Sequence, residues 1–362
     1  MHPQFGYLAE ITTALVAMTL LLAALTLIAH ARGRVRARSR AAESSALART
    51  FARFLTGDLS LDQLQADAVA VRGEVFWAAI EMFSDNIRGP EWVRLSTALH
   101  ALRVVLHEQR YLEDRRGWRR ALAARHLGML NDPRMRSPLR AALVRGPAAV
   151  RLSAALALAR LQDREAFLWL LEHPETTEAL GPRPVTAIIK RFGRRRASDA
   201  RLFLSAPGPE TPIRLAAIEM LGVWQDRAAR RVLETLLETG GRESRVAAAR
   251  ALGRLRDPAS TPALIAALAD AAWQVRAQAA RALGEMRSAD SLVALRQAME
   301  DAAWWVRRNA GYALASHGED GIAALHRLAQ LGSDAYAREM AIEVLQASAW
   351  DQHSPGGITR VA

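Results

Sequence analysis

The feature that most constrains this chain is an arginine that returns every 31 residues. It stands at Arg214, Arg245, Arg276, Arg307 and Arg338, and Arg120 and Arg151 keep the same spacing farther upstream. Alanine follows three residues after each arginine and leucine seven residues after it, as Ala279 and Leu283 follow Arg276. Because positions three and seven share one face of an α-helix, each copy predicts a helix with a small and a large residue on its buried face.

A second, shorter apolar segment precedes each copy, such as Thr261–Leu268. Each unit is therefore expected to be a helix pair, and units that repeat at such a period stack into an α-solenoid. The sequence predicts an all-α fold in which the solenoid covers residues 116–350.

The fullest copies are Asp270–Gly284 and Asp301–Arg307, in which tryptophan stands shortly before Val-Arg. They resemble the HEAT-repeat family, in particular the HEAT-like repeats of phycobilisome (PBS) lyase subunits, and the resemblance extends over about Gly117–Ala349. The resemblance implies a structural ladder of ion pairs between neighbouring units. Its members would be Asp270 and Asp301 with the arginine column, that is Arg120, Arg151, Arg214, Arg245, Arg276, Arg307 and Arg338.

The net charge of +12 is concentrated in two short stretches. Five arginines lie between Arg32 and Arg40, and five basic residues lie between Lys190 and Arg196; without these ten the net charge is only +2. This distribution is not the broad basic surface of a nucleic-acid-binding protein, so nucleic acid is not the expected partner. The chain has no cysteine, which excludes disulfides and thiolate metal sites.

An apolar run without any charge extends from Ile11 to Ala29. Its 19 residues would span about 28 Å as a helix, close to the thickness of a bilayer core. The five arginines follow the run and none precedes it, which predicts an N-terminus outside and a solenoid in the cytoplasm, with one pass through the inner membrane of a bacterium. We therefore expect an anchor at residues 1–31 and a basic juxtamembrane segment at 32–40. The alternative, a signal peptide cleaved at Ala29-His30-Ala31, would need a basic residue before the run.

The remaining segments depart from the 31-residue period. Residues 41–115 are expected to form an irregular helical cap and residues 351–362 a disordered tail. Between His173 and Pro184 the repeat pattern fails. We align Phe192-Gly193 with the Leu-Gly of regular copies, which puts Val185 at the arginine position; the alternative keeps Arg183 there.

No motif for catalysis, a cofactor or a metal is present, so the protein is not expected to be an enzyme. His100 and His107 lack a third ligand at a suitable spacing. The candidate partner-binding residues are Trp305, which is extra to the repeat, and the basic cluster of Lys190, Arg191, Arg194, Arg195 and Arg196. The cluster would be a solvated face, a contact for anionic lipid headgroups, or a docking site for an acidic protein.

The expected function is a membrane-anchored scaffold or adaptor that binds protein partners, for example as an accessory subunit of a membrane enzyme such as a glycosyltransferase. Two alternatives stay open. The family resemblance alone suggests a bilin-lyase-like protein that acts on a chromophore or its carrier. A nucleic-acid-binding HEAT-like protein would show steep salt dependence of binding.

Overall fold

The computed structural model describes residues 4–84, 87 and 89–353, without the side chains of 4–17, 29, 31, 33, 35, 36 and 349–353. The described elements are helices, as the repeat pattern predicts. They form two compact units, residues 1–157 and 158–362. Most of the predicted disordered tail lies outside the described residues, but residues 351–353 continue the last helix.

The first unit contains an irregular group of helices followed by the first regular pairs. Its elements are α1 (Gln4–Thr56), α2 (Leu61–Ala70), α3 (Gly73–Ser84), α4 (Pro90–Leu99), α5 (Arg103–Tyr111), α6 (Gly117–Leu130), η1 (Pro133–Met135), α7 (Arg136–Arg145) and most of α8 (Ala148–Arg160). The C-terminal part of α1 packs on α3, where Phe51 and Phe76 are fully buried and meet edge to face. This part of α1 is therefore a core element of the first unit.

The predicted membrane anchor is wrong. Within the described residues, no helix combines the length and the apolar character that crossing a membrane requires. The apolar side chains described in α1, from Met18 to Ile28, extend over about 16 Å of helix, roughly half of a bilayer core. The rest of the expected span, residues 11–17 and 29, lies outside the described side chains. The predicted location, a single pass through an inner membrane with the solenoid in the cytoplasm, is corrected accordingly.

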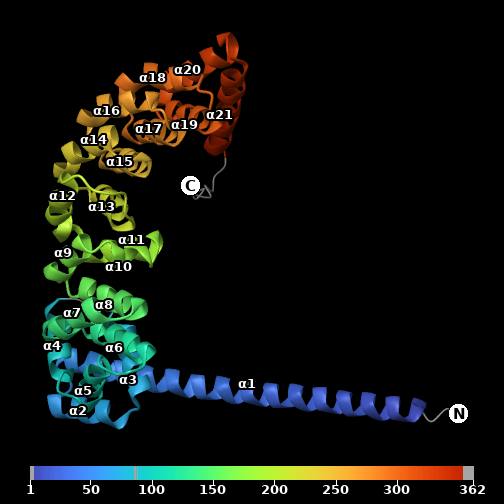
Figure 1. Cartoon of the computed structure of the whole chain (residues 1–362), viewed down its shortest axis with the longest axis vertical. Coiled ribbons are helices and arrows are strands. Elements are labelled where there is room, and N and C mark those ends of the chain that lie inside the picture. Colours follow the sequence, from blue (N-terminus) through green and yellow to red (C-terminus); the bar gives the residue numbers. More distant parts are fainter. Residues whose placement is uncertain (1–3, 85–86, 88, 354–362) are drawn as a thin grey trace. The chain divides into compact units, whose positions relative to one another are not determined.

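The second unit is a run of helix pairs in two layers (Figure 1). Its α-helices after α8 are α9 (Arg164–Glu172), α10 (Glu175–Glu178), α11 (Pro182–Phe192), α12 (Ala197–Ser205), α13 (Pro212–Val223), α14 (Arg230–Thr239), α15 (Arg242–Leu255), α16 (Thr261–Ala266), α17 (Trp273–Met286), α18 (Leu292–Ala298), α19 (Trp304–Ala315), α20 (Gly318–Leu331) and α21 (Ala335–His353). Its 3₁₀ turns are η2 (Arg194–Arg196), η3 (Arg227–Ala229), η4 (Pro258–Ser260), η5 (Ala267–Ala269) and η6 (Ala289–Ser291). Helices α11, α13, α15, α17 and α19 pack on one another in sequence, and α12, α14, α16 and α18 cover one side of that layer.

The layer of α13, α15, α17 and α19 is close-packed because small residues face one another. Glycine stands eight residues after several column arginines, at Gly222, Gly253 and Gly284. A Cβ added at Gly253 would lie 2.8 Å from the Cα of Ala282 on the next helix. The alanines and leucines of the repeat are buried as predicted, except Leu345, whose place in the core of α21 is taken by Val344.

The predicted register of the irregular unit is also wrong. Five helices of the repeat, α6, α8, α13, α15 and α17, are followed closely by a residue with positive φ, and these residues are Asn131, Gln162, Gln225, Arg256 and Arg287. Gly193, with a φ of 72°, stands 31 residues after Gln162 and belongs to this column rather than to the Leu-Gly column. Val185 and Ile189 are therefore the buried small and large positions of α11, and Lys190 takes the place of glycine.

Candidate protein-interaction site

The arginine column caps helices. Each guanidinium donates to backbone carbonyls at or just after the end of the preceding helix, where carbonyls lack helical partners. The acceptors are Leu112 for Arg120, Val144 for Arg151, Leu204 and Ala206 for Arg214, Gly240 for Arg245, Asp270 and Ala271 for Arg276, Asp301 and Ala302 for Arg307, and Gly332 and Ser333 for Arg338.

Two arginines of this column also bind a carboxylate. Arg245 binds Asp270 through two nitrogens at 2.8 and 3.0 Å, and Arg276 binds Asp301 in the same way at 2.6 and 2.9 Å. Burial opposes ionisation of Asp301, but hydrogen bonds from Arg276 and from the Ala303 N–H outweigh it and hold its pKa below the ordinary value. Asp270 and Asp301 each stand 25 residues after the arginine that they bind, and the residue 25 positions after Arg307 is Gly332. Arg307 therefore has no carboxylate at this position, and its guanidinium lies over the ring of Tyr336, 5.1 Å from its centroid.

The basic cluster lies where α11 turns into η2. Lys190 and Arg191 occupy the last turn of α11, Arg194 and Arg195 open η2, and all four are exposed. Arg194 stands 31 residues after Asp163 and in the same column as Asp226 and Asp257. This turn therefore carries a positive charge where the turns of Asp163, Asp226 and Asp257 carry a negative one.

Arg196 differs from the rest of the cluster because it packs inside the unit. Its guanidinium lies 3.3 Å from Asp199 and donates to the carbonyl of Gln162 at 3.4 Å. Asp199 is only 6% exposed and also binds Arg164 at 2.7 Å. The hydrogen bond from Arg164 lowers the pKa of Asp199 more than burial raises it, and Arg196 lowers it further. The structure thus assigns Arg196 a packing contact and leaves the other four residues at the surface.

The aromatic–arginine cluster of Trp304, Trp305, Arg308 and Tyr312 lies on α19. Trp304 and Trp305 are 43% and 50% exposed, and their rings meet edge to face at 4.7 Å. The guanidinium of Arg308 lies 5.7 and 5.9 Å from these two rings and 4.9 Å from the ring of Tyr312. These contacts hold a large, partly exposed aromatic surface together.

The structure does not bring the two candidates together. The pairs α13 with α14, α15 with α16 and α17 with α18 lie between α11 and α19 along the second unit. Sequence reasoning selected Trp305 but missed Arg308 and Tyr312. The spacing of four residues from Trp304 to Arg308 and from Arg308 to Tyr312 was the signal, since residues four apart are neighbours on a helix.

Helix pairs stacked at a 31-residue period define this chain as an α-solenoid. Residues 202–273 and 261–346 match the family described as HEAT repeats, and residues 150–173 match the PBS lyase HEAT-like repeat. The repeats within residues 150–173 and 202–346 are therefore similar to HEAT repeats. No curated protein matches the sequence at a significant level.

The solved structures that are similar to the chain include the following three. Human deoxyhypusine hydroxylase shares 20% identity, with a TM-score of 0.32 over 78% of this chain and 98% of that one. The complex of CpcE and CpcF of phycocyanin lyase from Nostoc sp. PCC7120 shares 20% identity, with a TM-score of 0.26 and coverages of 80% and 95%. Kap95p, from a structure with RanGDP, shares 12% identity, with a TM-score of 0.48 over 82% of this chain and 51% of that one. The chain thus spans about half the length of Kap95p.

Proposed function

We propose that the protein is a non-catalytic scaffold that binds a protein partner through the aromatic–arginine cluster on α19. The observation that carries the proposal is the half-exposed pair Trp304 and Trp305, held by Arg308. Hot spots of protein interfaces are enriched in tryptophan, tyrosine and arginine. A solenoid also offers the extended surface on which such proteins bind partners.

The exposed residues of the basic cluster supply a second, electrostatic contact in this proposal. Lys190, Arg191, Arg194 and Arg195 would face an acidic region of the same partner, since charge complementarity raises the association rate. Arg196 is not part of this contact because Asp199 and Gln162 hold it.

The test compares partner recovery by variants of the full chain in affinity capture from the cells that express it. Trp305→Ala combined with Arg308→Gln should lower the affinity for the recovered partner by roughly thirtyfold, as loss of an interface hot spot does. Trp273→Ala is the matched control because Trp273 has a similar exposure and occupies the same repeat position as Trp304. Arg194→Gln with Arg195→Gln should lower recovery mainly at low salt. Equal recovery by the control and the Trp305 variant would refute the proposal.

A further inference from the structure

A pocket of about 520 Å³ lies among α3, α5 and α6 of the first unit. Pockets of this size are typical of sites for small organic ligands. Aromatic side chains form much of its wall: Trp77 from α3, Tyr111 at the end of α5 and Trp118 at the start of α6. Trp118 is 62% exposed, so a flat ligand can reach its ring from solvent.

The inner end of this pocket carries polar groups that are buried. Glu108, which is 8% exposed, lies 2.6 Å from Nδ1 of His126, and Trp77 stacks on the His126 ring at 4.6 Å. This contact engages Nδ1 and leaves Nε2 of His126 without a described partner. The buried indole N–H of Trp77 also lacks an acceptor among the described residues. A buried donor left unpaired is costly.

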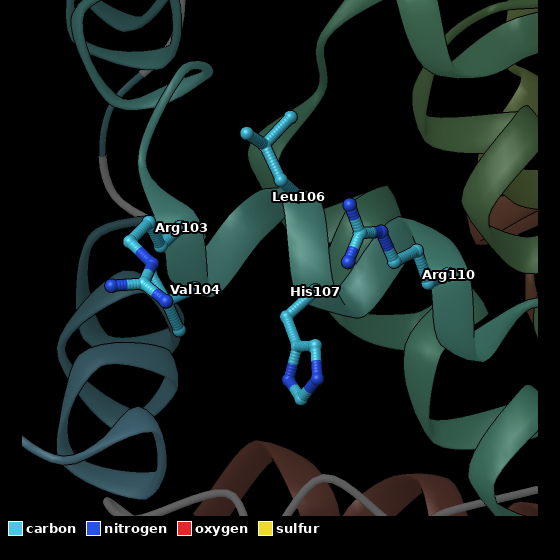
Figure 2. Close-up of a pocket in the computed structure, with 5 residues that line it drawn as sticks. All are labelled: Arg103, Val104, Leu106, His107 and Arg110. Carbon is cyan, nitrogen blue, oxygen red and sulfur yellow. The ribbon is translucent and has the colours of Figure 1, made fainter.

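Positive charge adjoins the aromatic wall. A second pocket, of about 480 Å³, shares Val104 and His107 with the first and adds Arg103 and Arg110. Figure 2 shows Arg103, His107 and Arg110 projecting from α5, with His107 between the two arginines. No carboxylate lines this second pocket among the described residues, and neither arginine forms an ion pair with one of them.

The carboxylates of the aromatic pocket are already engaged. Glu108 holds His126, and Glu74 binds Arg40 at 3.1 Å. The charge left for a ligand is therefore positive, which favours an anion over a cation. The aromatic wall selects a planar ring, because flat rings stack on tryptophan and tyrosine.

We infer that the first unit binds a small planar aromatic anion across α5. The Arg119 guanidinium lies over both aromatic rings, 5.3 Å from that of Trp118 and 5.4 Å from that of Tyr111. The ligand ring packs beside it against Trp118 and Tyr111, and the anionic group binds Arg103, His107 and Arg110. This site lies in the first unit, whereas the aromatic–arginine cluster and the basic cluster lie in the second, so the inference is independent of the scaffold function.

The test uses two fluorescent probes that differ by one sulfonate. The full chain is titrated with 8-anilinonaphthalene-1-sulfonate and with uncharged N-phenyl-1-naphthylamine. We expect saturable binding of the sulfonate at one site and weaker binding of the uncharged probe. The double variant Arg103→Gln with Arg110→Gln should weaken binding of the sulfonate by about tenfold or more, as loss of charge-assisted hydrogen bonds does, and leave the uncharged probe unchanged. Trp118→Ala should weaken both probes.

The control is Arg194→Gln with Arg195→Gln, which removes two exposed arginines from another part of the chain and should change neither titration. All substituted residues are exposed, so far-ultraviolet circular dichroism should match the wild type. Sulfonate binding that is equal in the wild type and the Arg103/Arg110 variant would overturn the inference. Equal affinity of the wild type for both probes, or unchanged binding by Trp118→Ala, would overturn it as well.

Discussion

The arginines of the 31-residue column make different contacts along this chain, depending on the groups that lie beside each of them. Arg276 binds two backbone carbonyls and the carboxylate of Asp301, whereas Arg338 binds two carbonyls and no carboxylate among the described residues. The carbonyls belong to the backbone, so no side-chain pattern could reveal them as acceptors. The 31-residue spacing therefore predicted the arginine column but not its capping contacts.

Replacing Arg276 by alanine should lower the free energy of unfolding by about 1–3 kcal/mol, because the half-buried Asp301 loses its partner. Arg338→Ala should cost less, since no carboxylate is left unpaired. Arg281, which is exposed and pairs with Glu285 in its own helix, provides the control: its alanine variant should stay within about 0.5 kcal/mol of the wild type. Urea unfolding followed by circular dichroism measures all three, and equal losses for Arg276 and Arg281 would contradict the ladder.

Asp199 should make stability depend on pH. Its pKa in the folded protein lies below the ordinary value, chiefly through the hydrogen bond from Arg164. Such a group contributes stability above the unfolded pKa of about 4, and the contribution is lost as the pH falls through the folded pKa. Asp199→Asn should thus be less stable than the wild type at pH 7 by about 1–3 kcal/mol. The difference should shrink below about pH 4 in paired thermal melts, and a constant difference down to pH 2 would exclude this role.

At the scale of the element, the close contact between neighbouring helices depends on glycine. Gly253→Ala would place a methyl group 2.8 Å from both the Cα and the Cβ of Ala282, which forces α15 and α17 apart. We expect a loss of about 1–3 kcal/mol, as for other overpacked contacts.

Gly73→Ala is the control for that substitution, because its Cβ would meet only the Val104 side chain at an ordinary 3.6 Å. Thermal unfolding of both variants measures the difference in stability. A Gly253 variant as stable as the Gly73 variant would show that α15 and α17 can accommodate the added methyl group without loss of stability.

The helices themselves followed from the sequence, whereas the register of α11 did not. Glycine occurs in two columns of this fold, inside the helix as at Gly253 and at the left-handed end as at Gly193. A glycine in the sequence does not by itself indicate whether it permits a close helix contact or a backbone with positive φ. The pocket beside α5 was missed for another reason: Trp77, Glu108 and His126 are far apart in sequence and follow no period, so only the packing of α3, α5 and α6 reveals them.

At the scale of the whole molecule, periodicity predicted the architecture correctly, whereas hydropathy did not. The period of 31 predicted a stack of helix pairs because each pair buries its face against the next. The apolar run near the N-terminus suggested a membrane span that no described helix supports. A local count of apolar residues could not show that the same helix ends in the core of the first unit, where Phe51 and Phe54 are buried.

A solenoid whose contacts join neighbours should not unfold as one piece, and hydrogen exchange can show where it opens first. Helix α11 has Lys190 in place of the packing glycine, and it begins and ends next to glycines at positive φ, Gly181 and Gly193. Its amides should exchange at least tenfold faster than those of α15 and α17, which corresponds to about 1.4 kcal/mol less local stability. Exchange mass spectrometry at peptide resolution tests this. Gly253→Ala should then speed exchange in α15 and α17 and leave α11 unchanged, because nearest-neighbour coupling decays along the stack. Equal protection of α11 and α17, or acceleration throughout the second unit by Gly253→Ala, would mean that the stack opens as a single cooperative body.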